Sequence, residues 1–345
     1  MERKLASIQK VIGLHPIEGA DFIESCDVLG WHCVVKKGEF KPGDIGVFFE
    51  VDSLLPKTEE FSFMEKNRWR VKTVKFKGQI SQGLMLPITS IKSIDLSSFN
   101  EGDDVTETIK VEKWEPPEPY QKAANLKGRV KGLFPSFIKK TDETRIQAMP
   151  VFLSKFAGKT FFYTEKLDGS SVTFYLKDGN FGVCSRNLEL AADIISTEEN
   201  HNAFWKAATE LDIETHIRSI GKDNRALQGE LIGPGIQKNK YELKNFDIYF
   251  YNVWDIAGNK YVPSFSEFKF IINSMGLKTV PIIDKVKLNY SVDDLVQLSI
   301  DYSLLNGKVY REGIVFRPEF EETDDKFGRL SFKVINPEFL IRYDS

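Results

Sequence analysis

Short hydrophobic and aromatic runs separated by turn residues make up the first third of the chain. Residues 33–35 and 47–51 are such runs, and Gly38 and the turn at residues 42–44 lie between them. Runs of this length bounded by glycine and proline are typical of short β-strands. Because several such runs follow one another, the pattern predicts a small β-barrel over residues 1–112.

One stretch of this region alternates between cationic and hydrophobic positions. Every second residue of the segment 68–72 is a cation, namely Arg68, Arg70 and Lys72. A period of two predicts a strand with these cations on one face. The next cations, Lys75 and Lys77, are out of phase, so a bulge or bend is needed to bring all five to one surface.

Prolines separate this region from the next. Residues 115–119 contain three prolines, which cannot continue a helix or a central strand, so we expect a linker there. After it, residues 141–143 are compatible with a helix start capped by Thr141 or Asp142. Helical patterns such as residues 198–220 alternate with strand patterns such as residues 247–256, which predicts an α/β or α+β region.

Two strand-like runs, residues 160–165 and 170–175, flank the tetrapeptide Lys166-Leu167-Asp168-Gly169. The pattern predicts a strand, a tight turn at Gly169 and a second strand. Such a turn would hold a lysine amine rigidly beside a carboxylate. The tetrapeptide alone is weak evidence, because a surface hairpin with a solvated lysine–aspartate pair has the same pattern.

The charge is balanced over the whole chain but locally basic. The net charge of −3 argues against a uniformly basic surface. Residues 68–77 contain five cations and no acid, whereas residues 122–145 contain Asp142, Glu143 and the cations Lys122, Lys127, Arg129, Lys131, Lys139, Lys140 and Arg145. Such stretches favour partners that carry phosphate, although a solvated charged face is the alternative for either stretch alone.

The composition also restricts the compartment. No run of 18 hydrophobic residues occurs, and no hydrophobic segment follows the first residues, so we expect neither a membrane span nor a secretory signal. Cys26, Cys33 and Cys184 are an odd and scattered set, which makes a disulfide framework or a structural zinc site unexpected. We therefore expect an intracellular protein, in the cytoplasm or the nucleus, that is not secreted.

The N-terminal region contains an ordered series of family-like segments. Residues 8–11, 15–21, 38–44 and 79–86 together resemble the tRNA-binding OB-fold module. No single segment is highly specific, but their order is. The resemblance implies a nucleic-acid-binding platform.

A second series of segments follows the tetrapeptide at Lys166. These segments are residues 185–187, 229–233, 251–255, 312–317 and 331–333. In this order they resemble the motifs of the covalent nucleotidyltransferase superfamily, which comprises DNA ligases, RNA ligases and mRNA capping enzymes. The resemblance spans residues 141–335, essentially the whole second region.

The resemblance implies roles for individual residues. Lys166 would be the nucleophile that accepts AMP from ATP, and Asp168, Glu230 and Glu312 would hold the ribose or, through water, Mg²⁺ or Mn²⁺. Lys333 would touch the α-phosphate and completes the expected catalytic set. The residues expected to bind nucleotide are Arg145, Glu165, Lys166, Gly169, Arg186, Glu230, Tyr251, Glu312, Lys326 and Lys333.

Several of these roles have a chemical basis and some have alternatives. A lysine nucleophile must be a neutral amine, so its pKa has to fall from about 10.4. Tyr251 would stack on adenine, and an ordinary core aromatic is its alternative. Arg186 would lie near the ribose and the RNA end. The last motif usually carries a lysine where this chain has Ser331; Lys326 is a candidate substitute, although a solvated position is its alternative.

The domain order indicates the type of enzyme. DNA ligases and capping enzymes carry their OB domain after the last lysine motif, but here only residues 334–345 follow Lys333. Residues 141–147 also resemble the segment before the lysine motif in nick-sealing RNA ligases, in which Arg145 would meet the triphosphate. The chain thus resembles ATP-dependent nick-sealing RNA ligases with an N-terminal OB domain.

The fold expected from this resemblance is α+β. It consists of an OB-fold β-barrel at residues 1–115, a linker and basic segment at residues 116–140, and a ligase-type, ATP-grasp-like nucleotidyltransferase domain at residues 141–345. Some RNA ligases have asparagine where Ser171 stands, so one substrate contact would be made differently here.

The expected activity is the sealing of 3′-OH/5′-phosphate nicks in RNA repair, through a lysyl-AMP and an RNA-adenylate. The expected partner is a nicked duplex with an RNA 3′-OH strand and a template of RNA or DNA. We expect the protein to bind it as a monomer, and we expect no membrane partner. Joining of single-stranded ends stays open. The alternatives are a GTP-dependent capping guanylyltransferase, a DNA ligase and a non-enzymatic RNA-binding OB protein.

Overall fold

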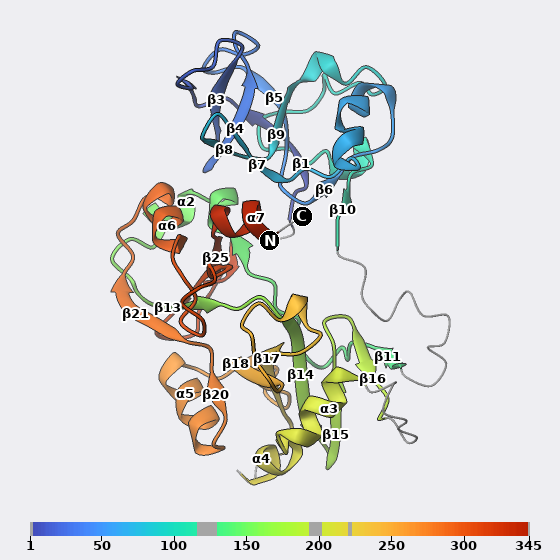
Figure 1. Ribbon diagram of the computed structural model, residues 1–345, viewed down its shortest axis with the longest axis vertical. Helices are drawn as coiled ribbons and strands as arrows, with labels where there is room; N and C mark the ends of the chain where they lie inside the picture. The colour runs from blue at the N-terminus through green and yellow to red at the C-terminus, as the bar shows by residue number, and fades with distance from the viewer. Residues whose placement is uncertain (1–2, 116–129, 193–201, 220–222, 344–345) are drawn as a thin grey trace.

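The fold is that of a computed structural model, which describes residues 3–115, 130–192, 202–219 and 223–343. The N-terminal part (residues 3–115) lies above the C-terminal part (residues 130–343), and the last helix, α7, lies between them (Figure 1). Within the described residues, no helix is long and apolar enough to cross a membrane.

Short strands build the N-terminal part, as the hydrophobic runs predict. They pair in the orders β1-β5-β9, β2-β3-β4, β7-β8 and β10-β6. The strands are β1 (Ala6–Lys10), β2 (Gly13–Pro16), β3 (Ile23–Val28), β4 (Trp31–Lys36), β5 (Ile45–Phe49), β6 (Ser53–Leu54), β7 (Thr73–Phe76), β8 (Gln79–Gln82), β9 (Leu84–Pro87) and β10 (Glu112–Lys113). The short helices are η1 (Glu59–Asn67), η2 (Ile88–Ser90) and α1 (Thr106–Ile109).

Strand β5 is central to this barrel because it is buried on both faces. Phe48 packs with Trp31 and Met85 on one side, whereas Val47 and Phe49 pack on the other. Strand β5 pairs with β1 on one edge and with β9 on the other. The predicted runs at residues 33–35 and 47–51 therefore supply core strands, which confirms the expected barrel.

The strand predicted over residues 68–72 is wrong. Arg68 and Trp69 have φ of 53° and 57°, so the chain turns there instead of extending. Arg70 is buried, and its guanidinium pairs with Asp52 and lies 3.3 Å from the ring centroid of Trp114. Contacts distant in the sequence override the local alternation, and these cations do not share one exposed face.

Two sheets form the C-terminal part. The larger follows the order β11-β16-β15-β14-β17-β18-β19, with β20 beside β18, and the smaller follows β12-β25-β22-β13-β21. Their strands are β11 (Val130–Leu133), β12 (Thr144–Arg145), β13 (Thr160–Lys166), β14 (Ser170–Lys177), β15 (Asn180–Cys184), β16 (Leu188–Leu190), β17 (Arg225–Ile232), β18 (Asp247–Asp255), β19 (Lys260–Tyr261), β20 (Lys278–Thr279), β21 (Ile282–Lys287), β22 (Gly313–Pro318) and β25 (Phe332–Ile335), with a separate pair β23 (Thr323–Asp324) and β24 (Gly328–Arg329).

Helices cover these sheets and bury their apolar faces. They are η3 (Ile146–Ala148), α2 (Val151–Lys155), α3 (Ala203–Glu210), α4 (Ile213–Ser219), η5 (Gln237–Asn239), α5 (Phe265–Ser274), α6 (Val292–Ser299) and α7 (Pro337–Tyr343). Asn202 and Ser264 cap α3 and α5 with their side chains, and Ser291 and Asp294 form a capping box on α6. Because helices pack on one face of β14 and Trp254 and Ile138 pack on the other, Phe174 and Tyr175 are both buried.

Several secondary-structure predictions for this part can be compared with the fold. Helices α3 and α4 confirm the helical pattern within residues 202–219, and β18 confirms the strand pattern near residues 247–256. The helix start predicted at residues 141–143 is wrong, because these residues lead into strand β12. Their acids pair with distant cations instead of capping a helix, as described below.

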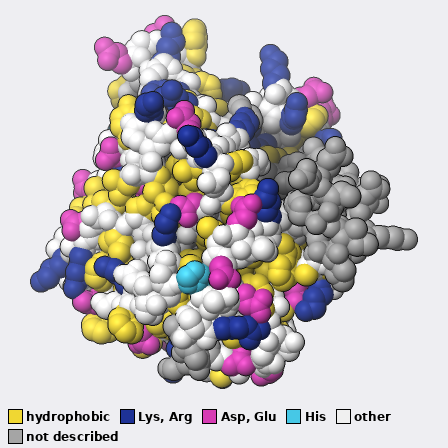
Figure 2. All heavy atoms as spheres, turned by 60° about the horizontal axis from the view of Figure 1, so that its bottom comes forward, with side chains coloured by type: hydrophobic (Ala, Val, Ile, Leu, Met, Phe, Trp, Pro, Cys, Tyr) yellow, Lys and Arg dark blue, Asp and Glu magenta, His cyan; other side chains and the backbone are white. Residues whose placement is uncertain are grey.

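Some predictions fall on segments outside the described residues. These include the prolines of the expected linker and the cations Lys122, Lys127 and Arg129 of the predicted basic stretch. Within that stretch, Val130–Leu133 forms β11, and Arg145 is buried, so it does not contribute to an exposed stripe. On the face shown in Figure 2, Lys and Arg side chains are interspersed with Asp and Glu.

Candidate active site

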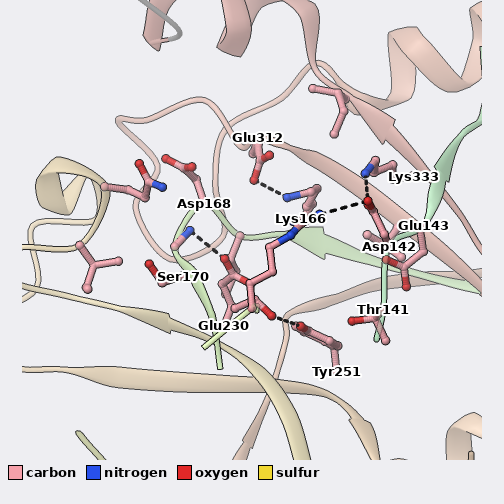
Figure 3. A pocket seen from close by; sticks show the side chains of 18 of the residues that line it. Thr141, Asp142, Glu143, Lys166, Asp168, Ser170, Glu230, Tyr251, Glu312 and Lys333 are labelled. Carbon is pink, nitrogen blue, oxygen red and sulfur yellow. Dashed lines mark hydrogen bonds and ion pairs between the residues drawn. The ribbon is translucent and has the colours of Figure 1, made fainter. Parts of the chain in front are cut away.

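A pocket of about 730 Å³ opens where the two sheets of the C-terminal part meet. Strand β13 belongs to the smaller sheet and β14 to the larger, so the turn at Leu167–Gly169 passes from one sheet to the other. The two strands therefore do not form the surface hairpin that was the alternative for this motif. The turn places Lys166, Asp168 and Gly169 in the pocket wall, as Figure 3 shows for Lys166 and Asp168.

Lys166 is the last residue of β13 and pairs with the carboxylate of Glu312, which directly precedes the neighbouring strand β22. Its Nζ donates to Glu312 Oε2 at 2.6 Å, because the antiparallel register sets Lys166 opposite Gly313. Burial alone would lower the pKa of Lys166, but Glu312, Glu230 and Asp168 outweigh burial and raise it. The three carboxylates therefore favour the protonated form of the Lys166 amine.

Glu230 faces the same lysine from strand β17. Its Oε1 accepts a hydrogen bond from the backbone N–H of Gly169 at 3.1 Å. Burial raises the pKa of Glu230 to about 8, and the nearby carboxylates of Glu312 and Asp168 add to this rise. A Cβ at residue 169 would collide with the Leu231 carbonyl oxygen and with Ile232, so the close approach of the turn to β17 requires glycine.

Asp168 is held by two neighbouring residues that the sequence patterns did not single out. Lys240 Nζ pairs with the Asp168 carboxylate, and Tyr241 Oη accepts a hydrogen bond from the Asp168 N–H at 2.8 Å. Thus the expected Lys166–Asp168 pair is replaced by two pairs, Lys166 with Glu312 and Asp168 with Lys240. Nothing in the sequence marks Lys240, which follows a loop whose residues 237–239 have positive φ.

The three carboxylates provide oxygen donors for a divalent cation. Within the described ranges, no group of three or more His, Cys, Asp or Glu side chains is arranged to hold a metal ion directly. Hard oxygen donors that converge without a complete coordination shell suit Mg²⁺, which retains several waters when it binds proteins. The residues therefore fit an ion held through water and substrate phosphate.

Cations occupy the opposite side of the pocket. Asp142 accepts hydrogen bonds from Lys333 at 2.8 Å and from Arg186 at 3.1 Å (Figure 3 shows the first). Burial would raise the pKa of Asp142, but the charges of Lys333, Arg186 and Lys113 lower it strongly. The pKa of Lys333 is lowered by burial and by nearby Lys166 and Arg145. These cations give this side of the pocket positive charge, which favours the binding of anions.

Arg145 connects the pocket with the N-terminal part. It is buried, and its Nη2 donates to Asp52 Oδ2 at 3.2 Å. Its Nη1 is also buried and has no hydrogen-bond partner among the described residues. Arg145 also lines the pocket, so its guanidinium adds positive charge to the pocket wall.

Tyr251 lies on the pocket floor, on strand β18. Its Oη is 3.1 Å from Ser171 Oγ, and Arg317 Nη1 donates to the Tyr251 carbonyl oxygen at 2.7 Å. Arg317 Nη2 also donates to Glu143 at 2.8 Å. The tyrosine is thus fixed at its hydroxyl and at its backbone, which suits a rigid platform for a flat ligand.

Two further predicted residues differ in their placement. Glu165 lines the pocket, but its Oε2 accepts a hydrogen bond from the Leu304 N–H at 2.8 Å, so it supports a neighbouring loop. Lys326 is exposed and lies over the ring of Phe327, and it is not among the residues that line the pocket. Lys326 is therefore not placed to substitute for the lysine missing at Ser331.

We expect the Glu143–Arg317 pair to make the stability depend on pH. Burial would raise the pKa of Glu143, but Arg317 and Arg329 lower it from its ordinary value near 4.5 to about 2. A depressed carboxyl pKa stabilises the fold above pH 4.5, and this contribution disappears as the pH falls to 2. The shift corresponds to about 3 kcal/mol.

Urea unfolding at a series of pH values checks this dependence with Glu143→Gln. The free-energy difference between wild type and variant should be largest near neutral pH and should shrink as the pH falls from 4.5 to 2. Glu214→Gln, which removes an exposed acid on α4, serves as the control and should leave the profile unchanged. If the difference in unfolding free energy between wild type and Glu143→Gln stays constant with pH, the Glu143–Arg317 pair does not cause the expected pH dependence.

Comparisons with known proteins agree with the two-part architecture. A family model described as an OB-fold domain matches residues 5–88, and a model described as RNA ligase matches residues 159–335. The chain is thus an OB-fold barrel joined to a ligase-type nucleotidyltransferase domain of α+β class, as expected from its motifs. No curated protein matches the chain.

Solved structures match over nearly the full length. The Naegleria gruberi RNA ligase with PPi is 38% identical, with a TM-score of 0.84, and the match covers 99% of both chains. A mutant of that ligase with ATP and Mn is 37% identical, with a TM-score of 0.86, over 99% of this chain and 100% of the other. A mutant with AMP and Mn is 38% identical, with a TM-score of 0.84, over 98% of each. This chain belongs to the RNA ligase family.

Proposed function

We propose that this chain is an ATP-dependent RNA ligase that seals 3′-OH/5′-phosphate nicks through AMP bound covalently to Lys166. The observation that carries the proposal is the position of Lys166. Its Nζ donates to Glu312 at 2.6 Å, and Glu230, Lys333 and Arg145 line the same pocket. The acids beside this lysine would attract a metal ion, and the cations would attract phosphate. This arrangement suits attack of the lysine on a metal-bound nucleoside triphosphate.

ATP and a divalent ion are the proposed cofactors. The Naegleria gruberi ligase, which is similar over its whole length, has been solved with ATP and Mn and with AMP and Mn. In this chain Asp168, Glu230 and Glu312 would hold Mg²⁺ or Mn²⁺ through water. The ion would supply positive charge that compensates these carboxylates and the departing pyrophosphate.

The residues of the pocket would divide the first step among them. Tyr251 would stack on adenine, Lys333 would contact the α-phosphate, and Arg145 would meet the triphosphate. Lys166, once deprotonated, would attack the α-phosphorus; a P–N bond forms, and pyrophosphate leaves with the electrons of the broken P–O bond. Charge neutralisation by the metal and in-line positioning would together contribute most of the acceleration.

Two further transfers would complete the reaction. The 5′-phosphate at a nick would attack the phosphorus of the lysyl-AMP, which releases the Lys166 amine and forms an RNA-adenylate. The adjacent 3′-OH would then attack the 5′-phosphate, lose its proton, and expel AMP. Arg186, at the edge of the pocket and bound to Asp142, would lie near the RNA end.

The substrate is proposed to be a nicked duplex whose 3′-OH strand is RNA, bound by a monomer. We propose that residues 1–115 act as the nucleic-acid-binding domain and residues 141–345 as the catalytic domain, with residues 116–140 between them. The burial of Arg145 against Asp52 supports a pocket built from both parts. Binding to phosphates should weaken with added salt.

Nicked duplexes that differ only at the 3′-OH nucleotide test the substrate assignment. With ATP and Mg²⁺, we expect sealing of a nick with a 3′-ribonucleotide and little sealing of a nick with a 3′-deoxyribonucleotide. GTP in place of ATP should support neither reaction. Equal sealing of both nicks would indicate a DNA ligase, and use of GTP would indicate the capping alternative.

A further inference from the structure

The loop between α6 and β22 is fixed to the strand that carries Lys166. Its Leu304 N–H donates to Glu165 Oε2 at 2.8 Å, and Glu165 precedes Lys166 in β13. The Ser303 N–H donates to the Val309 carbonyl oxygen at 2.8 Å, which closes the loop. The loop leads directly into Glu312. These contacts hold the loop rigidly beside the reacting lysine.

The outer side of this loop displays aromatic rings. Tyr302 and Tyr310 are paired across an isolated bridge, and their rings stack with centroids 5.0 Å apart and planes inclined by 11°. The side chain of Tyr302 is 47% exposed, and Leu304 beside it is 59% exposed. A contiguous exposed patch of apolar side chains can mark an interaction site.

This ring pair is continuous with the wall of the pocket. The guanidinium of Arg342, on α7, lies 5.8 Å from the ring centroid of Tyr310 and 5.6 Å from that of Tyr343. Tyr343 lines the pocket. The four residues Tyr343, Arg342, Tyr310 and Tyr302, here called the tyrosine row, therefore lead from the pocket to the surface. The helix that carries two of them, α7, lies between the N-terminal and C-terminal parts in Figure 1.

Charged groups around the row favour an anionic partner. Arg342 and Lys308 are exposed cations, and neither forms an ion pair with another residue of the described part of the chain. The acid of this loop, Asp301, is 3.6 Å from the guanidinium of Arg311, which offsets its charge. Glu338 on α7 is likewise paired, with Lys75 at 3.0 Å. The surface thus combines flat rings with unopposed positive charge.

We propose that the tyrosine row is a stacking platform for RNA bases of the strand whose end enters the pocket. This inference rests on the proposed function. Unstacked bases at RNA ends are bound on aromatic and arginine planes, and the interaction tolerates any base because every base has a flat face. Arg342 and Lys308 would contact the phosphates of the same strand. Nothing in this arrangement takes part in the attack of Lys166 on ATP.

Tyr302→Ala tests the platform, with Tyr302→Phe and Phe270→Ala as controls. The first control retains the ring, and the second removes a 72% exposed aromatic from α5, away from the row. Each protein is measured for covalent AMP formed with ATP and Mg²⁺ alone, and for the KM of a nicked duplex with an RNA 3′-OH strand. Loss of one base–aromatic contact corresponds to roughly a 5- to 100-fold weaker interaction.

The expected result is a raised KM for the nick in Tyr302→Ala, with wild-type AMP formation and wild-type behaviour of both controls. An unchanged KM in Tyr302→Ala overturns the platform. Loss of AMP formation in Tyr302→Ala also overturns it, since the ring would then act by supporting the loop and Glu312. Failure of the proposed function can be distinguished from failure of the platform, because in that case the wild-type protein itself forms no covalent AMP.

Discussion

Lys166→Arg is expected to abolish sealing with ATP, by roughly 10⁴-fold or more, because it removes the proposed nucleophile. Arginine retains a positive charge that can pair with Glu312, so the fold and the charge balance of the pocket are preserved. Its guanidinium stays protonated and cannot attack phosphorus. The loss should therefore arise from the chemistry of residue 166 and not from unfolding.

A pre-adenylated nick distinguishes loss of the nucleophile from general damage to the protein. The last step, in which the 3′-OH displaces AMP, does not use the lysine as a nucleophile, so Lys166→Arg should still join a nick that already carries AMP on its 5′-phosphate. Lys206→Arg, on the surface of α3, is the matched control and should seal both substrates like the wild type. If Lys166→Arg seals an ordinary nick with ATP at a comparable rate, the proposed intermediate is wrong.

Glu312→Gln should weaken the response of the enzyme to its divalent ion by roughly 10- to 100-fold, the range typical of residues that hold a metal indirectly. The substitution keeps the size of the side chain but removes one of the charges proposed to attract the ion. It also removes the carboxylate that accepts the 2.6 Å hydrogen bond from Lys166. AMP formation should therefore require much more Mg²⁺ or Mn²⁺.

The measurement is the initial rate of covalent AMP formation over a series of metal concentrations. Glu319→Gln, which removes an acid paired with Lys285 on the surface, should leave the curve unchanged. A Glu312→Gln curve that coincides with the wild-type curve would contradict a role of Glu312 at the metal.

The sequence predicted the residues of the pocket better than their contacts. Lys166, Asp168, Glu230, Tyr251, Glu312 and Lys333 all line one pocket, although they come from strands far apart in the sequence. Their motifs are short, and each contributes a side chain to the pocket wall. The pairing of Lys166 with Glu312 depends on the register of β13 and β22, which no local pattern specifies.

The features missed by the sequence depend on long-range contacts. Lys240 is one lysine among many, and only the path of its loop brings it to Asp168. Asp142 looks like a helix cap, but residues 141–143 lead into β12, and its carboxylate accepts hydrogen bonds from Lys333 and Arg186. Arg145 meets Asp52 only because the N-terminal part packs against the C-terminal part. Local propensity contains none of this information.

The hydrophobic patterns predicted a small barrel followed by an α/β or α+β region, and the resemblance of the motifs to known families specified the rest of the fold. The error at residues 68–72 has an equally physical cause. Arg70 is drawn inward by Asp52 and by the ring of Trp114, and two residues with positive φ turn the chain before it. An alternating pattern therefore predicts a strand only where the side chains of the segment have no strong partners elsewhere in the fold.

The most direct test of the central claim is the intact mass of the purified protein after incubation with ATP and Mg²⁺, followed by mapping of the modified peptide. We predict that the wild-type protein gains one AMP and that the modification lies on Lys166, with GTP giving no gain. Addition of a nicked RNA-containing duplex should then remove the AMP from the protein. A protein that gains no AMP, or that carries it on another residue, would contradict the account.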